Sequence, residues 1–471
     1  MKRLTLISAL VLLPLLAAGQ GKDWGSLSGG LESNSVLYRD WSFRSNNYVK
    51  LDYAKGRFSA GFQAEYYPTP LLGYSQDLKG FKLPGLYFAW TDAQWSVTAG
   101  SFFEQFGTGV LLRSWEDRNL GWNNALGGLR ATFRTKNDLF SIKAFAASPR
   151  FAASWLNQPL LMTGGEASLN IGVFSLQASV LGNQTLTTEG RGPMQVSWSA
   201  LAGVAVGGFS SRFEYVGRPG GNAQSLELHF AASSFSSALT VRRLKNMLDP
   251  LGMNYLPALC QEHSYMLASL NPYTTYEAGE FGGSLDLFYR IDGWKFHVNG
   301  SYIWSLPSAL RDHTTLRMGY RDLNVQVEKR WNKRLKTIAY LSIQENSPSH
   351  GQRKATNAQN VFVLDGVYRF PGKLSLRAQV QYLYSEELTK DWMAGSLELS
   401  STDGWAVHVQ DMYNHGSTKE HYYEAGGSWT HSGFKVSLAY GHQRAGMVCS
   451  GGVCRWQPEY TGAILRLNYH F

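Results

Sequence analysis

Apolar and polar side chains alternate along much of this chain. In residues 374–384, Leu, Ala, Val and Tyr occupy every second position, and Ser, Arg and Gln fill the intervening positions up to residue 381. The last eleven residues, 461–471, show nearly the same alternation. A period of two predicts β-strands that lie between an apolar and a polar medium. The predicted strands have about 10–13 residues, as bilayer-crossing strands need, whereas soluble strands usually have about 5–6.

The strands of a soluble β-sandwich also alternate between apolar and polar residues, so a membrane barrel needs separate evidence. Aromatic residues gather beside turns, as in an interfacial girdle: Trp294, Trp331, Trp405 and Phe434. The chain ends on Phe471, in the manner of the terminal aromatic by which outer-membrane barrels are recognised for assembly. We therefore predict a transmembrane antiparallel β-barrel, with Phe471 as its assembly signal and the barrel-assembly machinery as a partner during insertion.

Tight turns and longer polar loops follow one another in regular order. The predicted tight turns are Lys55-Gly56, Asp92-Ala93, Lys136-Asn137, Gly172-Val173, Gly207-Gly208, Asp292-Gly293, Trp331-Asn332, Pro371-Gly372, Asp403-Gly404 and Ser432-Gly433. Short periplasmic turns and long outer loops alternate in this way in outer-membrane barrels. With thirteen strands before residue 280 and eleven after it, the sequence predicts about 24 strands, or 20–24 if two weak segments are lost.

Composition and charge narrow the class further. Aromatic residues make up 14% of the chain and charged residues 17%, below the roughly 25% of soluble proteins. The mean hydropathy of −0.24 excludes a bundle of membrane helices, which needs runs of about 20 apolar residues. Without Lys2 and Arg3, the chain keeps 42 basic and 35 acidic residues. It contains no run of basic residues, so its charge does not predict a nucleic-acid partner.

Residues 1–19 have the features of a cleaved signal peptide. A basic start, an apolar stretch and a small-residue Ala-Ala-Gly site follow one another. An uncleaved membrane anchor is the alternative. We expect residues 20–471 to form a single barrel in the outer membrane of a Gram-negative bacterium, in contact with membrane lipid and lipopolysaccharide.

Two segments break the alternation and have the length to enter the lumen. A barrel of about 22 strands typically has a plugged lumen. Residues 102–128 carry Arg113, Glu116, Asp117 and Arg118 within six positions, which we interpret as a candidate lumen constriction. Residues 247–280 contain three Pro and four Tyr and are the second candidate plug. The alternative is an outer loop that folds on itself.

Cysteine and histidine residues offer little further chemistry. Cys449 and Cys454 lie in the last outer loop, and export to an oxidising compartment predicts a disulfide between them. Cys260 is then a buried free thiol. Residues 262–264, Glu-His-Ser, have the residue types of a hydrolase, but no G-x-S-x-G elbow and no H-E-x-x-H motif occurs. We expect no enzyme activity, no cofactor and no metal.

Three basic residues end a predicted strand just before the second segment. Arg242, Arg243 and Lys245 fall at the outer level of the membrane, where lipopolysaccharide phosphates lie. They are candidate outer-face lipid contacts. The alternative is the solvated base of a loop.

Two stretches resemble a known family. EQFGTGVLLRSWEDRNLGWNNAL, in residues 104–126, and NYLPALCQEHSYMLASLNPY, in residues 254–273, with Gly279-Glu280 following, are similar to a Bacteroidota outer-membrane β-barrel family of unknown function. The resemblance covers nearly the whole mature chain. It implies a barrel and a compartment, but no activity and no catalytic residues.

Two functions fit these features. The first is a plugged or constricted passive channel for a small polar solute, with opposed charges in residues 113–118 setting its selectivity. Residues 20–24 contain no energy-coupling box, which favours passive transport. The second is a non-transporting barrel, a subunit or scaffold of an outer-membrane assembly, secretion or surface-attachment complex that binds an outer-membrane lipoprotein or another partner. Tyr-rich outer segments suit such contacts.

Overall fold

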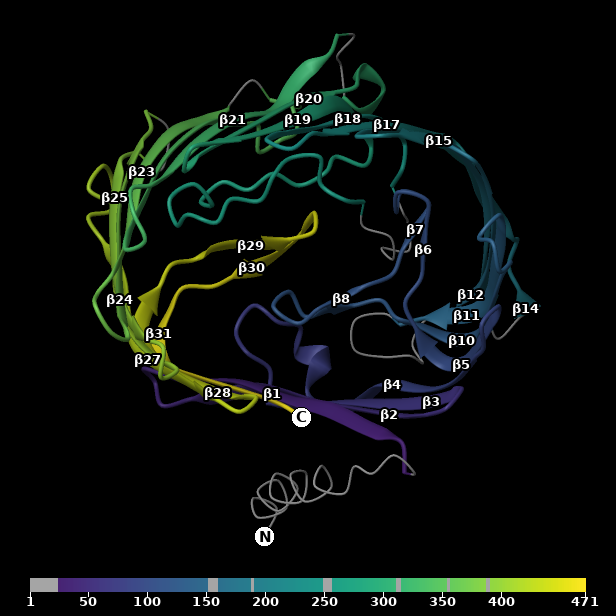
Figure 1. Cartoon of the computed structure of the whole chain (residues 1–471), viewed down its shortest axis with the longest axis horizontal. Helices are drawn as coiled ribbons and strands as arrows, with labels where there is room; N and C mark the ends of the chain where they lie inside the picture. The colour runs from purple at the N-terminus through teal and green to yellow at the C-terminus, as the bar shows by residue number, and fades with distance from the viewer. Residues whose placement is uncertain are drawn as a thin grey trace.

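In the computed structural model, the long strands form one closed antiparallel sheet. The structure describes residues 24–150, 160–187, 190–248, 256–310, 315–353, 356–386 and 390–471. In these ranges, 24 strands follow one another around the ring, and pairing of the first with the last closes the barrel (Figure 1). The expected signal peptide, residues 1–19, and residues 249–255 of the second segment lie outside these ranges. Among the described residues, no helix has the length and apolar character needed to span a membrane.

The strands of the barrel have 8–14 residues. In the first half they are Ser26–Tyr38 (β1), Phe43–Lys55 (β2), Phe58–Thr69 (β3), Gly80–Thr91 (β4), Trp95–Phe102 (β5), Leu126–Arg134 (β10), Phe140–Pro149 (β11), Leu160–Ile171 (β12), Phe174–Thr187 (β13), Gln195–Val206 (β15), Phe209–Arg218 (β16), Gly221–Ala231 (β17) and Phe235–Lys245 (β18). In the second half they are Gly279–Ile291 (β19), Trp294–Ser305 (β20), Arg317–Arg330 (β21), Leu335–Asn346 (β22), Asn357–Arg369 (β23), Leu374–Tyr384 (β24), Trp392–Ser401 (β25), Trp405–Tyr413 (β26), His421–His431 (β27), Phe434–Gln443 (β28) and Tyr460–His470 (β31).

The tight turns at one rim of the barrel lie where the sequence predicts them. All ten predicted tight turns join neighbouring strands, which confirms the count of thirteen strands before residue 280 and eleven after it, since β19 starts at Gly279. At Asp292-Gly293 both residues have positive φ, 43° and 77°, as a two-residue turn with the twist of a hairpin requires. At the same rim the chain end lies beside β1, where the backbone N–H and C=O of Phe471 bond to Gly29 at 3.1 Å each.

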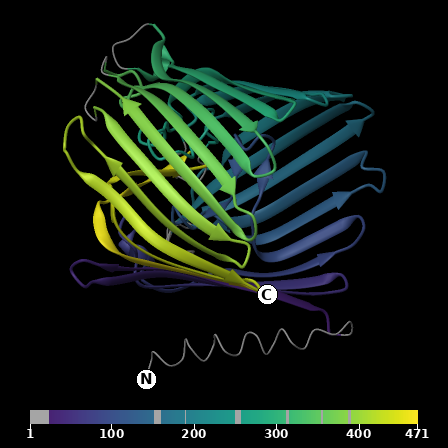
Figure 2. The ribbon, with the colours of Figure 1, turned by 60° about the vertical axis from the view of Figure 1, so that its left-hand side comes forward.

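Burial on the strands is reversed relative to a soluble protein. Val380 of β24 is 64% exposed on the outside of the barrel, whereas its neighbour Gln381, which faces the lumen, is 1% exposed. The strands are tilted around the ring (Figure 2). They present an apolar outer surface and a polar interior, as a barrel in lipid requires. Because the sheet is closed, no edge strand is left whose backbone N–H and C=O groups would lack partners inside a membrane.

Three connections at the other rim lie inside the ring in Figure 1. The first luminal segment is residues 103–125 and contains four two-residue strands, Gln105–Phe106 (β6), Leu112–Arg113 (β7), Glu116–Asp117 (β8) and Trp122–Asn123 (β9). The second luminal segment is residues 256–278. The luminal hairpin consists of Gly446–Ser450 (β29) and Val453–Gln457 (β30). It carries the two cysteines that were expected in an outer loop, and it lies inside the ring instead. The shorter connection with the 3-10 turn Gln76–Leu78 (η1) lies beside these segments.

Two minor elements complete the fold. Gly190–Arg191 (β14) extends the end of β13, and Pro307–Ala309 (η2) follows β20 as a 3-10 turn.

Aromatic side chains gather at the tight-turn rim. The ring centroids of Trp294 and Trp331 lie 6.3 Å apart, and the ammonium group of Lys329 lies 4.4 Å from the ring centroid of Trp294. Such an aromatic cluster at a rim is typical of an interfacial girdle.

Candidate functional site

The first luminal segment is fixed to the wall by apolar packing and by two wall carboxylates. Phe106 is 0% exposed within a cluster that it shares with wall residues of β10–β18. The backbone N–H of Gly107 donates to Glu166 at 3.1 Å, and that of Thr108 donates to Glu214 at 3.0 Å. Gly107 has φ +53°, and a Cβ there would lie 2.0 Å from Glu214 Oε1, so this position requires glycine.

The four charged residues predicted to form a constriction divide into two groups. Arg118 pairs with Glu32 of β1 at 2.9 Å and with Glu116 at 3.6 Å. Glu116 also accepts a hydrogen bond of 2.6 Å from Gln63 of β3. The structure therefore brings Glu116 and Arg118 together and connects both to wall strands near the barrel closure.

Arg113 and Asp117 have other partners. Arg113 donates to the carbonyl oxygen of Gly451, at the tip of the luminal hairpin, at 2.7 Å. Burial lowers the pKa of its guanidinium, and Glu262 opposes that shift. The Asp117 carboxylate accepts the backbone N–H groups two and three residues later, at 2.8 and 3.1 Å, and so stabilises a local turn. Arg113 therefore connects the first luminal segment to the luminal hairpin, whereas Asp117 stabilises a turn within the first luminal segment.

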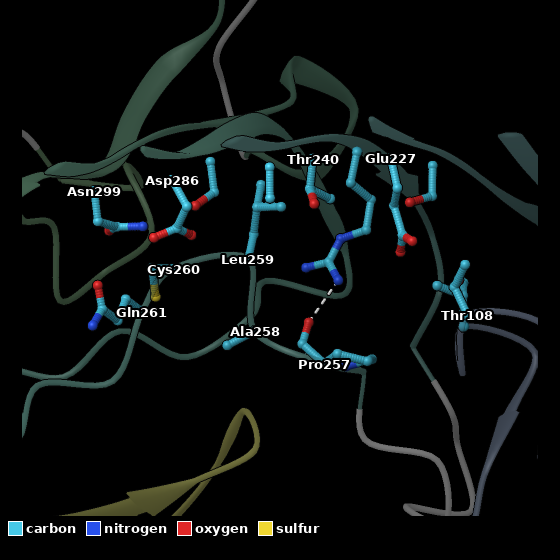
Figure 3. Close-up of a pocket in the computed structure, with 15 residues that line it drawn as sticks. Thr108, Glu227, Thr240, Pro257, Ala258, Leu259, Cys260, Gln261, Asp286 and Asn299 are labelled. Carbon is cyan, nitrogen blue, oxygen red and sulfur yellow. Dashed lines mark hydrogen bonds between the residues drawn. The ribbon is translucent and has the colours of Figure 1, made fainter. Parts of the chain in front are cut away.

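The second luminal segment is fixed by a buried carboxylate. Glu280 of β19 is 0% exposed and accepts hydrogen bonds from Arg242 at 2.9 Å and from the Tyr273 hydroxyl and the Tyr276 backbone N–H at 2.8 Å each. Arg242 also donates to the carbonyl oxygen of Pro257 at 2.6 Å (Figure 3). Burial, with the nearby Glu280 charge, raises the pKa of Tyr273 well above its usual value, so its hydroxyl stays a donor.

This geometry changes the expected role of Arg242. Its side chain is 5% exposed and faces the lumen, so it cannot reach membrane lipid. Arg243 points the opposite way, since adjacent strand residues alternate, and donates to Asn222 at 3.1 Å. Lys245 is exposed near the same rim. The alternation of Leu239 and Val241 with polar residues is the sequence signal that separates the two arginines.

Apolar packing holds the middle of the second luminal segment. Leu267 and Ala268 are 0% exposed and pack in a cluster with wall residues that include Leu383, also 0% exposed. Their backbone groups are satisfied by the wall: Gln381 accepts from the Leu267 N–H at 3.2 Å, and Gln344 donates to the Ala268 carbonyl at 3.0 Å. Inward glutamines of the wall thus bind the backbone of the second luminal segment.

The luminal hairpin joins the other inward connections. Cys449 and Cys454 face one another across β29 and β30 and form a disulfide. The guanidinium of Arg455 lies 4.3 Å above the ring of Tyr74 and donates to the carbonyl oxygens of Leu72 and Asn119 at 3.4 and 3.1 Å. The sequence gives no local signal for this inward fold, since Arg113 lies 338 positions from its partner Gly451.

Replacing both cysteines of the hairpin by serine should loosen it without opening the barrel. Closing a loop of about six residues contributes about 2 kcal/mol in the chain-entropy account. We expect Cys449→Ser/Cys454→Ser to be cleaved by chymotrypsin at Trp456 about tenfold or more faster than the parent, with the heat-dependent gel mobility of a folded barrel retained. Cys260→Ser, which keeps the disulfide, is the control. Equal cleavage rates in all three proteins would contradict a stabilising role.

Polar cavities remain between these elements and the wall. One, of about 310 Å³, is bounded by Thr108, Pro257 and Cys260 on the side of the luminal segments and by a polar wall of β17–β20 (Figure 3). That wall includes Glu227, Thr240, Arg242, Asp286 and Asn299. Burial raises the pKa of the Cys260 thiol, with Asp322 and Glu280 adding to the effect, so the thiol is protonated. A second cavity, of about 650 Å³, lies beside the luminal hairpin. In the described ranges, no group of three metal-ligating side chains occurs.

Comparisons with known proteins agree with this architecture. A family model described as "Family of unknown function (DUF6029)" matches residues 1–471. Among solved structures, the P pilus usher (PapC) translocation pore gives a TM-score of 0.50 at 9% identity, covering 95% of this chain and 99% of that chain. A mutant of the ferric enterobactin receptor PfeA from Pseudomonas aeruginosa gives a TM-score of 0.46 at 8% identity, covering 95% and 81%. At 9% identity, the likeness to the usher pore is one of fold alone. No curated protein matches the sequence.

Proposed function

The chain belongs to this DUF6029 family of unknown function along its whole length, and we propose that it is an outer-membrane barrel that acts as a constricted passive channel for a small polar solute. The fold is that of outer-membrane barrels, and its apolar outer surface would contact membrane lipid. Delivery would depend on cleavage of residues 1–19, and insertion on recognition of Phe471 by the assembly machinery. Arg243 and Lys245 would lie near lipopolysaccharide phosphates.

The observation that carries this proposal is the pair of polar cavities between the luminal segments and the wall. A ring of 24 strands without inward segments would be a wide pore, since barrel diameter grows with strand number. The two luminal segments and the hairpin subdivide this lumen, and the spaces that remain include cavities of about 310 and 650 Å³, the size range of small-molecule sites. Their lining is rich in charged and amide groups, which favours a polar solute over an apolar one.

Single-channel recording of the purified, folded barrel in a planar bilayer tests the proposal. We expect steady, ion-conducting steps, and we expect liposomes that contain the protein to swell in small polar solutes but not in oligosaccharides. Folding is checked by heat-dependent gel mobility. A folded protein that carries no current and admits no solute would contradict a passive channel. It would favour the alternative, a barrel that serves as a subunit or scaffold for a lipoprotein or another surface partner.

A further inference from the structure

Three arginines surround the larger luminal cavity. Arg444 follows β28, Arg455 belongs to β30 of the luminal hairpin, and Arg466 faces inward from β31. Their side chains come from different elements, and all three line the space of about 650 Å³. This cavity is separate from the one drawn in Figure 3, which β17–β20 enclose.

The charge balance of these arginines differs from that of many other cations in the lumen. Seven inward cations each lie within 4.0 Å of a carboxylate: Arg118, Arg130, Lys143, Arg150, Arg212, Arg242 and Arg377. In the parts of the chain that the structure describes, no ion pair joins a carboxylate to Arg444, Arg455 or Arg466. Arg444 and Arg455 are half-buried, whereas Arg466 is exposed. Because a partly desolvated charge without a counter-ion is costly, Arg444 and Arg455 favour an anion from solution.

The contacts of Arg455 leave its charge uncompensated. Its three hydrogen-bond acceptors, the Leu72 and Asn119 carbonyls and the Gln457 amide oxygen at 2.8 Å, are all neutral. They fix the guanidinium in place at the edge of the cavity. A fixed, planar group of this kind loses little freedom when it binds a planar or tetrahedral oxyanion.

Arg444 and Arg466 extend the positive region along the wall. Arg444 is shielded from water, and this desolvation lowers the pKa of its guanidinium, an effect that Tyr422 opposes. Arg466 sits opposite Asn34 and Ser437 on its two neighbouring strands, both uncharged. Tyr38 and Tyr460, whose ring centroids lie 5.3 Å apart, line the same cavity and carry hydroxyl groups.

The acidic residues near this cavity have other partners. Asp117 accepts two backbone N–H groups of its own turn. Glu262 is exposed, and its field acts on Arg113. Glu424 of the adjacent strand β27 accepts from His408 at 3.0 Å and from Gln443 at 2.9 Å. Asp117 and Glu262 line the cavity, so its three arginines face two carboxylates and the lining keeps a net positive charge.

We propose that this cavity binds a small oxyanion, of the carboxylate or phosphate type, and that such anions are the solutes which the channel admits. The transport of such anions rests on the proposed function, whereas the binding site rests only on the three arginines that have no carboxylate partner. Guanidinium groups bind oxyanions through paired, charge-assisted hydrogen bonds. The volume of about 650 Å³ accommodates such a solute with part of its hydration shell.

Calorimetric titration of the detergent-folded protein with inorganic phosphate tests the site. We expect binding by the parent and about tenfold or greater weakening in Arg444→Gln/Arg466→Gln, since each lost charge-assisted contact reduces affinity. Arg57→Gln/Arg334→Gln is the matched control, because both side chains are exposed at tight turns and this variant also removes two positive charges. The site is wrong if the parent does not bind phosphate or if the double variant binds as tightly as the parent.

Reversal potentials in a KCl gradient separate the site from the channel. We expect anion selectivity in the parent and in Arg57→Gln/Arg334→Gln, and its loss in Arg444→Gln/Arg466→Gln. A silent protein that still binds phosphate through these arginines would overturn the channel and keep the site. A conducting, cation-selective protein without phosphate affinity would keep the channel and overturn the site.

Discussion

Replacing residues 103–125 by an Asn-Gly turn should raise the single-channel conductance several-fold. Phe102 and Leu126 are partners in the ladder between β5 and β10, so a two-residue turn can close this hairpin without a change of register. The replacement removes the whole first luminal segment, including the contacts of Arg113 and Arg118. Glu166 and Glu214 lose the hydrogen bonds from Gly107 and Thr108, but Glu166 keeps its ion pair with Lys143, and water would then reach both carboxylates.

The expected increase follows from the open cross-section of the lumen. A wide barrel conducts in proportion to its unobstructed area, and the first luminal segment occupies part of that area in Figure 1. The control is replacement of residues 414–420, between the paired Tyr413 and His421, by the same turn. We expect that variant to conduct like the parent. Equal conductance of the 103–125 replacement and the parent would show that this segment does not limit the current.

Local sequence pattern was sufficient to predict the barrel itself. In β24 the alternation of Leu374, Leu376 and Val380 with polar residues specifies both faces, and each tight turn has residues that suit its backbone conformation. Strand length and turn spacing then determine the count, because each strand pairs with its neighbour in sequence. Little long-range information is needed for a fold built from consecutive hairpins.

The interior depends on contacts that no local pattern contains. The local alternation can tell the inward Arg242 from Arg243, but it does not identify Glu280, 38 positions away, as the partner of Arg242. The luminal hairpin has the composition of an ordinary surface loop, and its inward direction is set by partners such as Leu72, 383 positions from Arg455. Candidate residues could therefore be named from the sequence, but their partners could not.

Substitution of Glu280 by alanine should destabilise the protein by about 3–5 kcal/mol, the range for breaking a buried ion pair. Glu280 is 0% exposed, and its removal leaves the guanidinium of Arg242 without a counter-ion in a site that is itself only 5% exposed. The Tyr273 hydroxyl and the Tyr276 N–H would lose their acceptor as well. Equilibrium unfolding in guanidinium chloride, from detergent micelles, measures the change.

Two further variants separate the buried charge from a general loss of packing. Glu345→Ala breaks a pair with Arg321, whose side chain is 57% exposed, and should change the free energy of unfolding by at most about 1 kcal/mol. Arg242→Met/Glu280→Gln leaves no unpaired charge and should recover more than half of the loss, because a buried ion pair can often be replaced by neutral groups. If the double variant were as unstable as Glu280→Ala, the acceptor role of the carboxylate toward the second luminal segment, rather than its charge, would account for the effect. That segment would then be held mainly through Tyr273 and Tyr276, and its release should appear as proteolysis within residues 256–278 of a barrel that stays folded.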